Sequence, residues 1–212
     1  MPALGILGGS FNPPHAGHLA LARDARRELG LDLVLLMPLH TPAHKAADGD
    51  PGPEHRLEMT MLAAAAEPGV EASALEVQRR GPSYTADTLA EIHDADPDAE
   101  LTFIVGADTA LTLPEWRRPG AVLALARLAV ANRPGSERGE VLQTLQAIPL
   151  EALPGAPHAS PELVFLSMTP VEASSTEARE RLAAGEPLDG LLAPAVERYI
   201  LQHGLYGTGV RG

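Results

Sequence analysis

The sequence predicts an α/β fold in which a doubly wound, mostly parallel sheet of about six strands carries helices on both faces. Short β-type runs alternate with longer helix-type stretches along the whole chain. The run Leu101–Val105 is wholly apolar, as in a strand that is covered on both faces. A chain of 212 residues can bury one full-sized core, so we expect a single domain over residues 1–212.

The first part of the chain alternates strands and helices in a regular order. Leu4–Leu7 is a short apolar run that predicts a first strand, and apolar residues near the helical period predict a helix at Gly17–Leu29. Leu33–Met37 predicts the second strand. A loop rich in Pro, His and Asp follows from Pro38 to Pro53, before a helix at about Glu54–Ala66. Because most connections in compact domains are short, this loop is a candidate for function.

The second part continues the same alternation. Apart from the strand at Leu101–Val105, the remaining predicted elements are strands at Val70–Leu75, Leu128–Ala131 and Leu163–Leu166, and helices at Tyr84–His93, Ser175–Ala184 and Pro194–His203. The stretch 149–161 contains four prolines and predicts an irregular connection. The glycine-rich tail 207–212 is expected to fray.

The composition excludes several classes of function. Lys and Arg number 16 against 28 Asp and Glu, a formal charge of 16 − 28 = −12, which leaves no general cationic surface for polymeric nucleic acid. The most apolar window, Ala121–Ala131, is too short for a membrane span, which needs about 20 residues. No export signal precedes the early glycines and prolines. We therefore expect a cytoplasmic protein that binds neither polymeric nucleic acid nor a membrane.

The segment after the first predicted strand is suited to binding phosphate. Gly8 and Gly9 let the backbone approach an anion closely, and the following helix presents free amides and the positive end of its dipole. His15 and His18 lie three residues apart on the first helical turn, so both imidazoles can face one phosphate group. Gly17, between them, leaves room for a ligand.

The spacing of the two histidines, taken alone, also fits two other interpretations. The histidines can begin a solvated helix, or they can form half of a metal site. Zinc is disfavoured because the chain has no cysteine and no nearby carboxylate completes the ligand set. The glycine pair, the His-x-Gly-His spacing and the position after the first strand together favour phosphate.

The segment from Gly8 through Ser10 and Phe11 to Leu19 resembles the signature of the nucleotidyltransferase superfamily with the His-x-Gly-His motif. The second superfamily signature, Ser-Ser-Thr-x-x-Arg, is matched by Ser174-Ser175-Thr176-Glu177-Ala178-Arg179 at the start of a predicted helix. By itself such a segment is often only a helix cap. Together the two signatures imply a Rossmann-like sheet on which a nucleotidyl group is transferred from a nucleoside triphosphate.

Further segments are similar to the nicotinate-mononucleotide adenylyltransferase branch of this superfamily. They are Thr41-Pro42-Ala43-His44-Lys45, the helix start Pro82–Leu89, Gly106 and Asp108 after the fourth strand, Trp116, and Asn132-Arg133-Pro134-Gly135. Each also has a plain structural interpretation. Lys45 can be a solvated lysine, the segment 82–89 an ordinary helix cap, Trp116 a core residue and Arg133 a salt-bridge partner in a loop.

The resemblance implies that ATP and nicotinate mononucleotide react to give nicotinate adenine dinucleotide and pyrophosphate, a late step of NAD synthesis. It implies catalytic roles for His15, His18, Lys45 and Arg179, phosphate contacts for Gly8, Gly9, Ser10, Phe11, Ser174, Ser175 and Thr176, and nicotinate or ribose contacts for Tyr84, Thr85, Gly106, Asp108, Trp116 and Arg133. Mg²⁺ is expected on the ATP phosphates and water, so no protein metal ligand is named.

Three alternatives to this function stay open from the sequence. Within the superfamily, the acceptor can be nicotinamide mononucleotide or phosphopantetheine. From another class, the chain can be a nucleotide sensor without turnover. The third alternative is a structural or partner-binding α/β domain. The sequence also allows a homo-oligomer.

Overall fold

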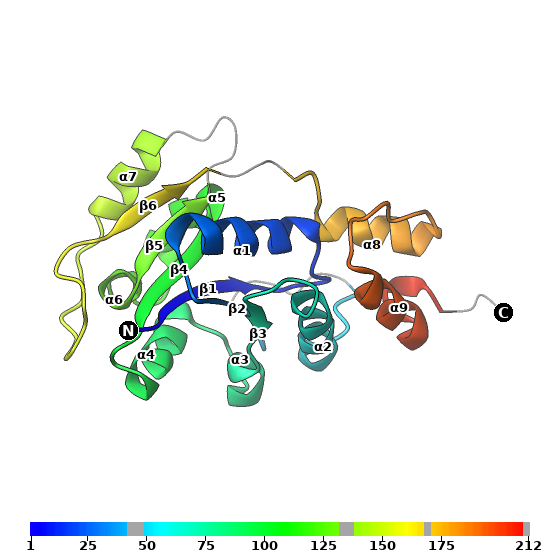
Figure 1. Ribbon diagram of the computed structural model, residues 1–212, viewed down its shortest axis with the longest axis horizontal. Coiled ribbons are helices and arrows are strands. Elements are labelled where there is room, and N and C mark those ends of the chain that lie inside the picture. Colours follow the sequence, from blue (N-terminus) through cyan, green and yellow to red (C-terminus); the bar gives the residue numbers. More distant parts are fainter. Residues whose placement is uncertain (42–48, 132–137, 168–170, 210–212) are drawn as a thin grey trace.

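The computed structural model describes residues 1–41, 49–131, 138–167 and 171–209. Its centre is a parallel sheet in the order β3-β2-β1-β4-β5-β6 (Figure 1). The strands are β1 (Ala3–Gly9), β2 (Leu33–Pro38), β3 (Val70–Ala72), β4 (Glu100–Gly106), β5 (Arg127–Ala131) and β6 (Leu163–Leu166). The chain moves outward from β1 to β3, then returns and continues on the other side of β1 from β4. This reversal opens a crevice at the carboxyl ends of β1 and β4, where ligands bind in sheets of this type.

Both faces of the sheet are covered by helices. The helical segments are α1 (Ala16–Leu29), α2 (Pro53–Ala64), α3 (Leu75–Arg79), α4 (Thr85–Ala95), α5 (Ala107–Leu111), η1 (Leu113–Glu115), α6 (Pro119–Leu125), α7 (Arg138–Gln146), α8 (Ser175–Ala184), α9 (Pro194–His203) and η2 (Leu205–Gly207). No helix in the described ranges is both long and apolar enough to cross a membrane.

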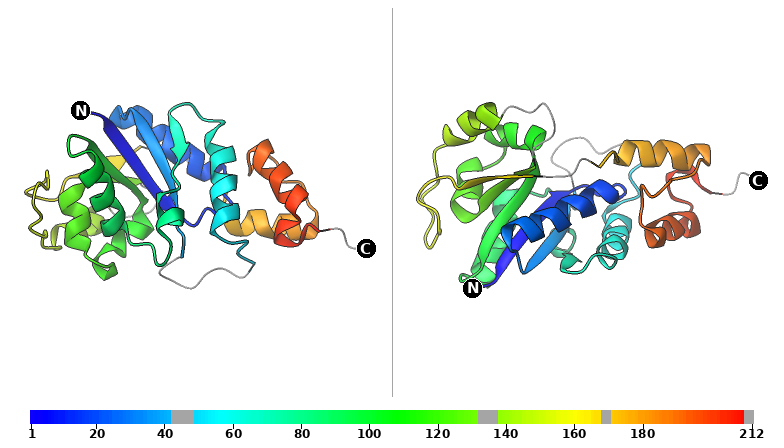
Figure 2. Two further views of the ribbon diagram at one scale, coloured as in Figure 1. Left: turned by 90° about the horizontal axis from the view of Figure 1, so that it is seen from below. Right: turned by 45° about the horizontal axis from the view of Figure 1, so that its top comes forward.

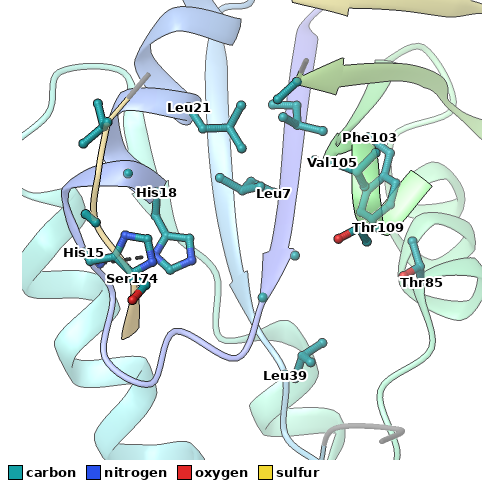
Figure 3. Close-up of a pocket in the computed structure, with 18 of the residues that line it drawn as sticks. Leu7, His15, His18, Leu21, Leu39, Thr85, Phe103, Val105, Thr109 and Ser174 are labelled. Carbon is teal, nitrogen blue, oxygen red and sulfur yellow. Dashed lines mark hydrogen bonds between the residues drawn. The ribbon is translucent and has the colours of Figure 1, made fainter. Parts of the chain in front are cut away.

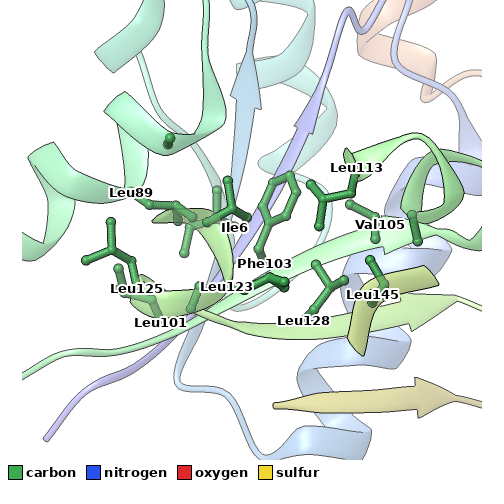
Figure 4. Close-up of a cluster of buried hydrophobic side chains, with 14 of the residues drawn as sticks. Ile6, Leu89, Leu101, Phe103, Val105, Leu113, Leu123, Leu125, Leu128 and Leu145 are labelled. Atoms are coloured by element: carbon green, nitrogen blue, oxygen red, sulfur yellow. The ribbon is translucent and has the colours of Figure 1, made fainter. Parts of the chain in front are cut away.

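Neighbouring residues of each central strand point into different cores. Ile6 and Phe103 belong to the core beneath α4 and α6 (Figure 4), whereas Leu7 and Ile104 belong to the core beneath α1. Leu7 pairs in register with Ile104 across the sheet. This alternation explains why Leu101–Val105 is apolar throughout, and it confirms the predicted doubly wound, parallel architecture.

The helices after residue 173 form a separate group at one end of the sheet. We call residues 174–208 the C-terminal unit; it contains α8, α9 and η2. Figures 1 and 2 show α8 and α9 beyond the sheet, next to α2. Met59 of α2, Leu182 of α8 and Ile200 of α9 share a buried cluster. The C-terminal unit therefore packs against the main fold through α2.

All predicted elements are present, and their ends lie within two residues of the prediction with one exception. The expected strand Val70–Leu75 ends at Ala72, and Leu75 begins α3 instead. The reason is Ser73, whose amide donates to the Leu36 carbonyl at 2.9 Å and whose hydroxyl accepts from the Leu75 amide at 3.3 Å. The Ser73 amide thus makes the last hydrogen bond to β2, and its hydroxyl turns the chain toward α3. The prediction of an irregular connection over 149–161 is confirmed.

Candidate active site

A cavity of about 780 Å³ opens at the carboxyl ends of β1 and β4. This volume lies in the upper part of the range for small-molecule sites, which is roughly 300 to 1,000 Å³. Figure 3 shows His15, His18 and Ser174 on one side of the cavity, Thr85 and Thr109 on the other, and Leu7 between them. The cavity therefore joins the two regions that the sequence assigned to phosphate and to the acceptor.

The two histidines stack on each other at the start of α1. Their ring centroids are 3.7 Å apart, and His18 Nδ1 accepts a hydrogen bond from the His15 backbone amide at 3.2 Å (Figure 3). A Cβ on Gly17 would lie 3.1 Å from two atoms of the His15 ring. Gly17 therefore makes room for the His15 ring, which is a more specific role than the predicted space for a ligand.

The His18 imidazole is neutral near pH 7. Burial, and secondarily the charge of His15, lower the pKa of His18 from 6.5 to about 3. Because Nδ1 accepts a hydrogen bond, the single proton of the neutral ring resides on Nε2. His18 thus offers one N–H donor without a positive charge, rather than the charge neutralisation that histidines supply when protonated.

This lowered pKa predicts a difference in acid stability. The unfolded chain protonates His18 near pH 6.5, whereas the folded chain does so only near pH 3, so His18 makes the protein lose stability as the pH falls through 6.5. Replacing His18 with Gln removes this loss. We expect the wild type to lose about 2 kcal/mol more than His18→Gln between pH 7.5 and pH 5.0, as measured by urea unfolding. If both proteins lose the same free energy of unfolding, the pKa of His18 is not lowered in the folded protein.

The turn Gly8–Phe11 lines the cavity with its first two residues and packs into the core with its last. Gly8 and Gly9 line the cavity, as predicted, whereas Ser10 and Phe11 do not. The Phe11 side chain is fully buried and packs edge-on against His18, with ring centroids 4.8 Å apart. Its φ of +48° lies in the left-handed region, which costs about 1 to 2 kcal/mol for a residue with a Cβ. The Phe11 ring therefore supports His18 from behind, and a contact of the Phe11 backbone with phosphate stays a prediction.

The second signature touches the first directly. Ser174 caps α8 by accepting from the Glu177 amide at 3.1 Å, and it also lines the cavity. Ser175 Oγ donates to the Pro13 carbonyl at 2.9 Å, and Arg179 Nη1 donates to the Asn12 carbonyl at 2.7 Å.

The cavity lining does not include the other residues of the second signature, Ser175, Thr176 and Arg179. Arg179 Nη2 is 3.3 Å from the Thr176 hydroxyl. In this structure Ser175 and Arg179 hold the turn before His15, and their contacts with phosphate stay a prediction.

The opposite wall holds the predicted acceptor residues only in part. Thr85, Gly106 and Trp116 line the cavity. Trp116 Nε1 donates to Thr112 Oγ1 at 3.0 Å, and its ring lies edge-on to Phe103, which fixes its orientation. Trp116 thus lines the cavity and also packs against the core, and its contact with the acceptor stays a prediction.

Two predicted acceptor contacts lie outside the cavity lining. Tyr84 is covered by Arg117, whose guanidinium carbon lies 4.5 Å above the Tyr84 ring, and Arg117 is paired with Asp87 at 3.0 Å. Asp108 is exposed on α5. Tyr84 therefore supports the wall by holding Arg117 beside Trp116.

The features of the cavity wall that favour an anion are helix starts. Among the described residues that line it, none is Lys or Arg, and Glu172 and Glu177 are acidic. However, α1, α4 and α8 all begin at its wall, so the positive ends of their dipoles point inward. The predicted cations Lys45 and Arg133 lie outside the described residues. An acidic protein can thus accept an anionic ligand at this point.

Sequence reasoning missed Arg56, whose side chain is 0% exposed. Its guanidinium donates to the carbonyls of Ser10 at 3.0 Å, Leu39 at 2.6 Å and His40 at 2.8 Å, and it pairs with Asp50 at 3.0 Å. Arg56 thereby ties the ends of β1 and β2 together beneath the cavity. Nothing in the sequence distinguishes this arginine from a solvated one on an exposed helix face.

Comparison with known proteins agrees with this geometry. The family model described as cytidylyltransferase-like matches residues 6–181. A probable nicotinate-nucleotide adenylyltransferase of Roseiflexus sp. (strain RS-1) is 43% identical over 204 residues, covering 96% of this chain and 97% of that protein. One from Trichlorobacter lovleyi is 40% identical over 209 residues, covering 96% and 98%. The fold is similar to that of Plasmodium falciparum nicotinic acid mononucleotide adenylyltransferase complexed with NaAD, with a TM-score of 0.77, 16% identity and 99% coverage of both chains.

Proposed function

The chain belongs to the cytidylyltransferase-like family and, within it, to the nicotinate-nucleotide adenylyltransferases, and from this membership we propose that it joins ATP and nicotinate mononucleotide to give nicotinate adenine dinucleotide and pyrophosphate. The observation that carries the proposal is that His18 and Trp116 line the same cavity. A phosphate-binding end and an aromatic end in one space suit a reaction between a triphosphate and a mononucleotide with an aromatic ring.

The proposed reaction needs no covalent enzyme intermediate. A phosphate oxygen of the mononucleotide attacks the α-phosphorus of ATP and forms a new P–O bond. The bond from the α-phosphorus to the bridging oxygen breaks, and its electron pair leaves with pyrophosphate. The protein has to bring two polyanions together and stabilise the charge that develops on the phosphates.

The described residues divide this work between the two ends of the cavity. His18 donates its Nε2–H to a phosphate oxygen, and His15 lies beside it. The starts of α1 and α8 add their dipoles at the same end. Trp116 stacks on the pyridine ring, and the start of α4 at Thr85 faces the carboxylate of nicotinate. Lys45 and Arg133 are proposed as further phosphate and nucleotide contacts.

Mg²⁺ is proposed as a partner of the ATP phosphates, whose charge it screens when bound. Within the described ranges, no group of three His, Asp or Glu side chains is arranged to hold a metal ion. We propose that phosphate oxygens and water hold the Mg²⁺. We also propose that residues 1–212 act as one domain, since the buried cluster around Met59 joins the C-terminal unit to the main fold. The cytoplasm is proposed as its location, as the sequence leads us to expect.

The fate of a label tests the reaction. ATP labelled in its α-phosphate is incubated with nicotinate mononucleotide, Mg²⁺ and purified protein. We expect the label in the dinucleotide, and a label in the γ-phosphate is expected in pyrophosphate. Label released as AMP, or no product from a folded protein that binds ATP, would contradict adenylyl transfer and favour the nucleotide sensor.

Replacing Trp116 with Ala should weaken binding of the mononucleotide selectively. Loss of the stacking surface is expected to raise the KM for nicotinate mononucleotide about 10-fold, while the KM for ATP changes little. Trp116→Phe keeps an aromatic ring and serves as the matched control. Equal changes in both KM values would show that Trp116 only supports the fold.

A further inference from the structure

The turn that leads into the histidine pair is held from the far end of the chain. Asn12 is 3% exposed and lies between the end of β1 and His15. Its carbonyl accepts from Arg179, and its side-chain Oδ1 accepts from the Tyr206 hydroxyl at 2.7 Å. The C-terminal unit thus holds both the backbone and the side chain of one residue, 194 positions before Tyr206 in the chain.

Tyr206 is placed for this contact at some conformational cost. Its φ of +55° lies in the left-handed region, which residues with a Cβ rarely adopt. Its hydroxyl also lies 4.0 Å from Met59 Sδ, in the cluster that joins α2 to the C-terminal unit. Burial, and secondarily the charge of Asp50, raise the pKa of Tyr206 well above its usual value. The phenol therefore stays protonated and donates to Asn12.

Breaking this contact leaves a buried acceptor without its donor. Asn12 Oδ1 cannot recover the lost hydrogen bond from bulk solvent while the turn keeps its place, because the residue is buried. The turn must then move for the Asn12 side chain to find a water molecule as its new donor. Any such shift is passed to His15 and His18, which follow Asn12 by three and six positions and line the cavity.

From this contact we infer that Tyr206 is a positioning residue, which holds the Asn12 turn so that the histidine pair faces the α-phosphate. The inference rests on the proposed function, because it assigns the histidines to the triphosphate. It adds a residue outside both sequence signatures and outside the cavity. It also gives the C-terminal unit a role in catalysis, in addition to its packing against α2.

Tyr199 offers a matched control within the same unit. Its hydroxyl lies 2.8 Å from His55 Nδ1, and His55 is on α2. Tyr199 therefore joins the C-terminal unit to α2 without touching the Asn12 turn. Tyr199→Phe and Tyr206→Phe each remove one hydroxyl from a tyrosine of this unit, so a general loosening of the unit would affect both variants alike.

The test compares these two variants in the full chain, at a temperature below the melting temperature of both. We expect Tyr206→Phe to lower kcat about 10-fold while the KM for nicotinate mononucleotide stays the same. Tyr199→Phe should keep the wild-type kcat. In an Asn12→Ala background, Tyr206→Phe should have no further effect, because its partner is already gone. The imidazole NMR signals of His15 and His18 should shift in Tyr206→Phe and not in Tyr199→Phe.

The inference is overturned by an unchanged kcat with unmoved imidazole signals in Tyr206→Phe, or by equal losses in both variants. The NMR comparison needs no turnover, so it decides the inference even if the wild type makes no dinucleotide. A wild type without product would instead refute the proposed function. A lower melting temperature with an unchanged kcat would reduce Tyr206 to a structural residue.

Discussion

Replacing His18 with Ala should lower kcat by about 10² to 10³, the usual effect of losing one donor to the transition state. The neutral His18 ring carries its proton on Nε2, and Phe11 fixes it from behind. Such a preorganised donor needs no rearrangement when charge develops on the α-phosphate. The effect should therefore appear in kcat more than in either KM.

Steady-state kinetics with both substrates varied will measure this effect. Circular dichroism and the melting temperature must first show that the variant is folded. His203→Ala is a suitable control, because His203 is exposed on α9 and its Nδ1 is 2.9 Å from the Tyr199 carbonyl, away from the cavity. An unchanged kcat in folded His18→Ala would remove His18 from the mechanism.

Replacing Arg56 with Ala should lower the free energy of unfolding by about 3 to 5 kcal/mol, the range expected when one partner of a buried ion pair is removed. The substitution leaves Asp50 without its partner and three carbonyls, those of Ser10, Leu39 and His40, without a donor. Because these groups lie at the ends of β1 and β2, the floor of the cavity should loosen as well.

Urea unfolding at pH 7.5 will measure the loss. Arg23→Ala is the matched control, since the Arg23 side chain is 51% exposed and pairs with Glu67 at 3.5 Å and with Asp24 at 3.6 Å. We expect the pairs of this exposed arginine to contribute less than about 1 kcal/mol. If both substitutions cost the same, the buried network around Arg56 does not stabilise the fold in the way described.

The sequence predicts the elements best where their ends carry capping signals. The bounds Ser175–Ala184 and Pro194–His203 are correct, because Ser174 and Pro194 mark their starts and the left-handed glycines Gly185 and Gly204 mark their ends. The helices at 107–111 and 113–115 were missed because they are too short to show a helical period. The helix at 119–125 was missed for another reason. It is buried on all sides from Gly120 to Leu125, so it has no polar face.

The structure brings predicted site residues together where local chemistry decides their place. Gly8, Gly9, His15, His18, Thr85, Gly106, Trp116 and Ser174 all line the cavity. The residues that hold these groups in place could not be found in the same way. Arg56 contacts Ser10 across 46 positions, and Tyr206 contacts Asn12 across 194. Such contacts depend on the folded topology, and no spacing in the sequence reports them.

Pyrophosphate release with different acceptors tests the central claim most directly. Purified protein with ATP and Mg²⁺ is given nicotinate mononucleotide, nicotinamide mononucleotide or phosphopantetheine at matched concentrations. We predict the highest kcat/KM for the nicotinate form, because the start of α4 at Thr85 favours a carboxylate and Trp116 favours a flat ring. A preference for phosphopantetheine or for the amide form would contradict the roles of Thr85 and Trp116, and no release with any acceptor would contradict the enzyme itself.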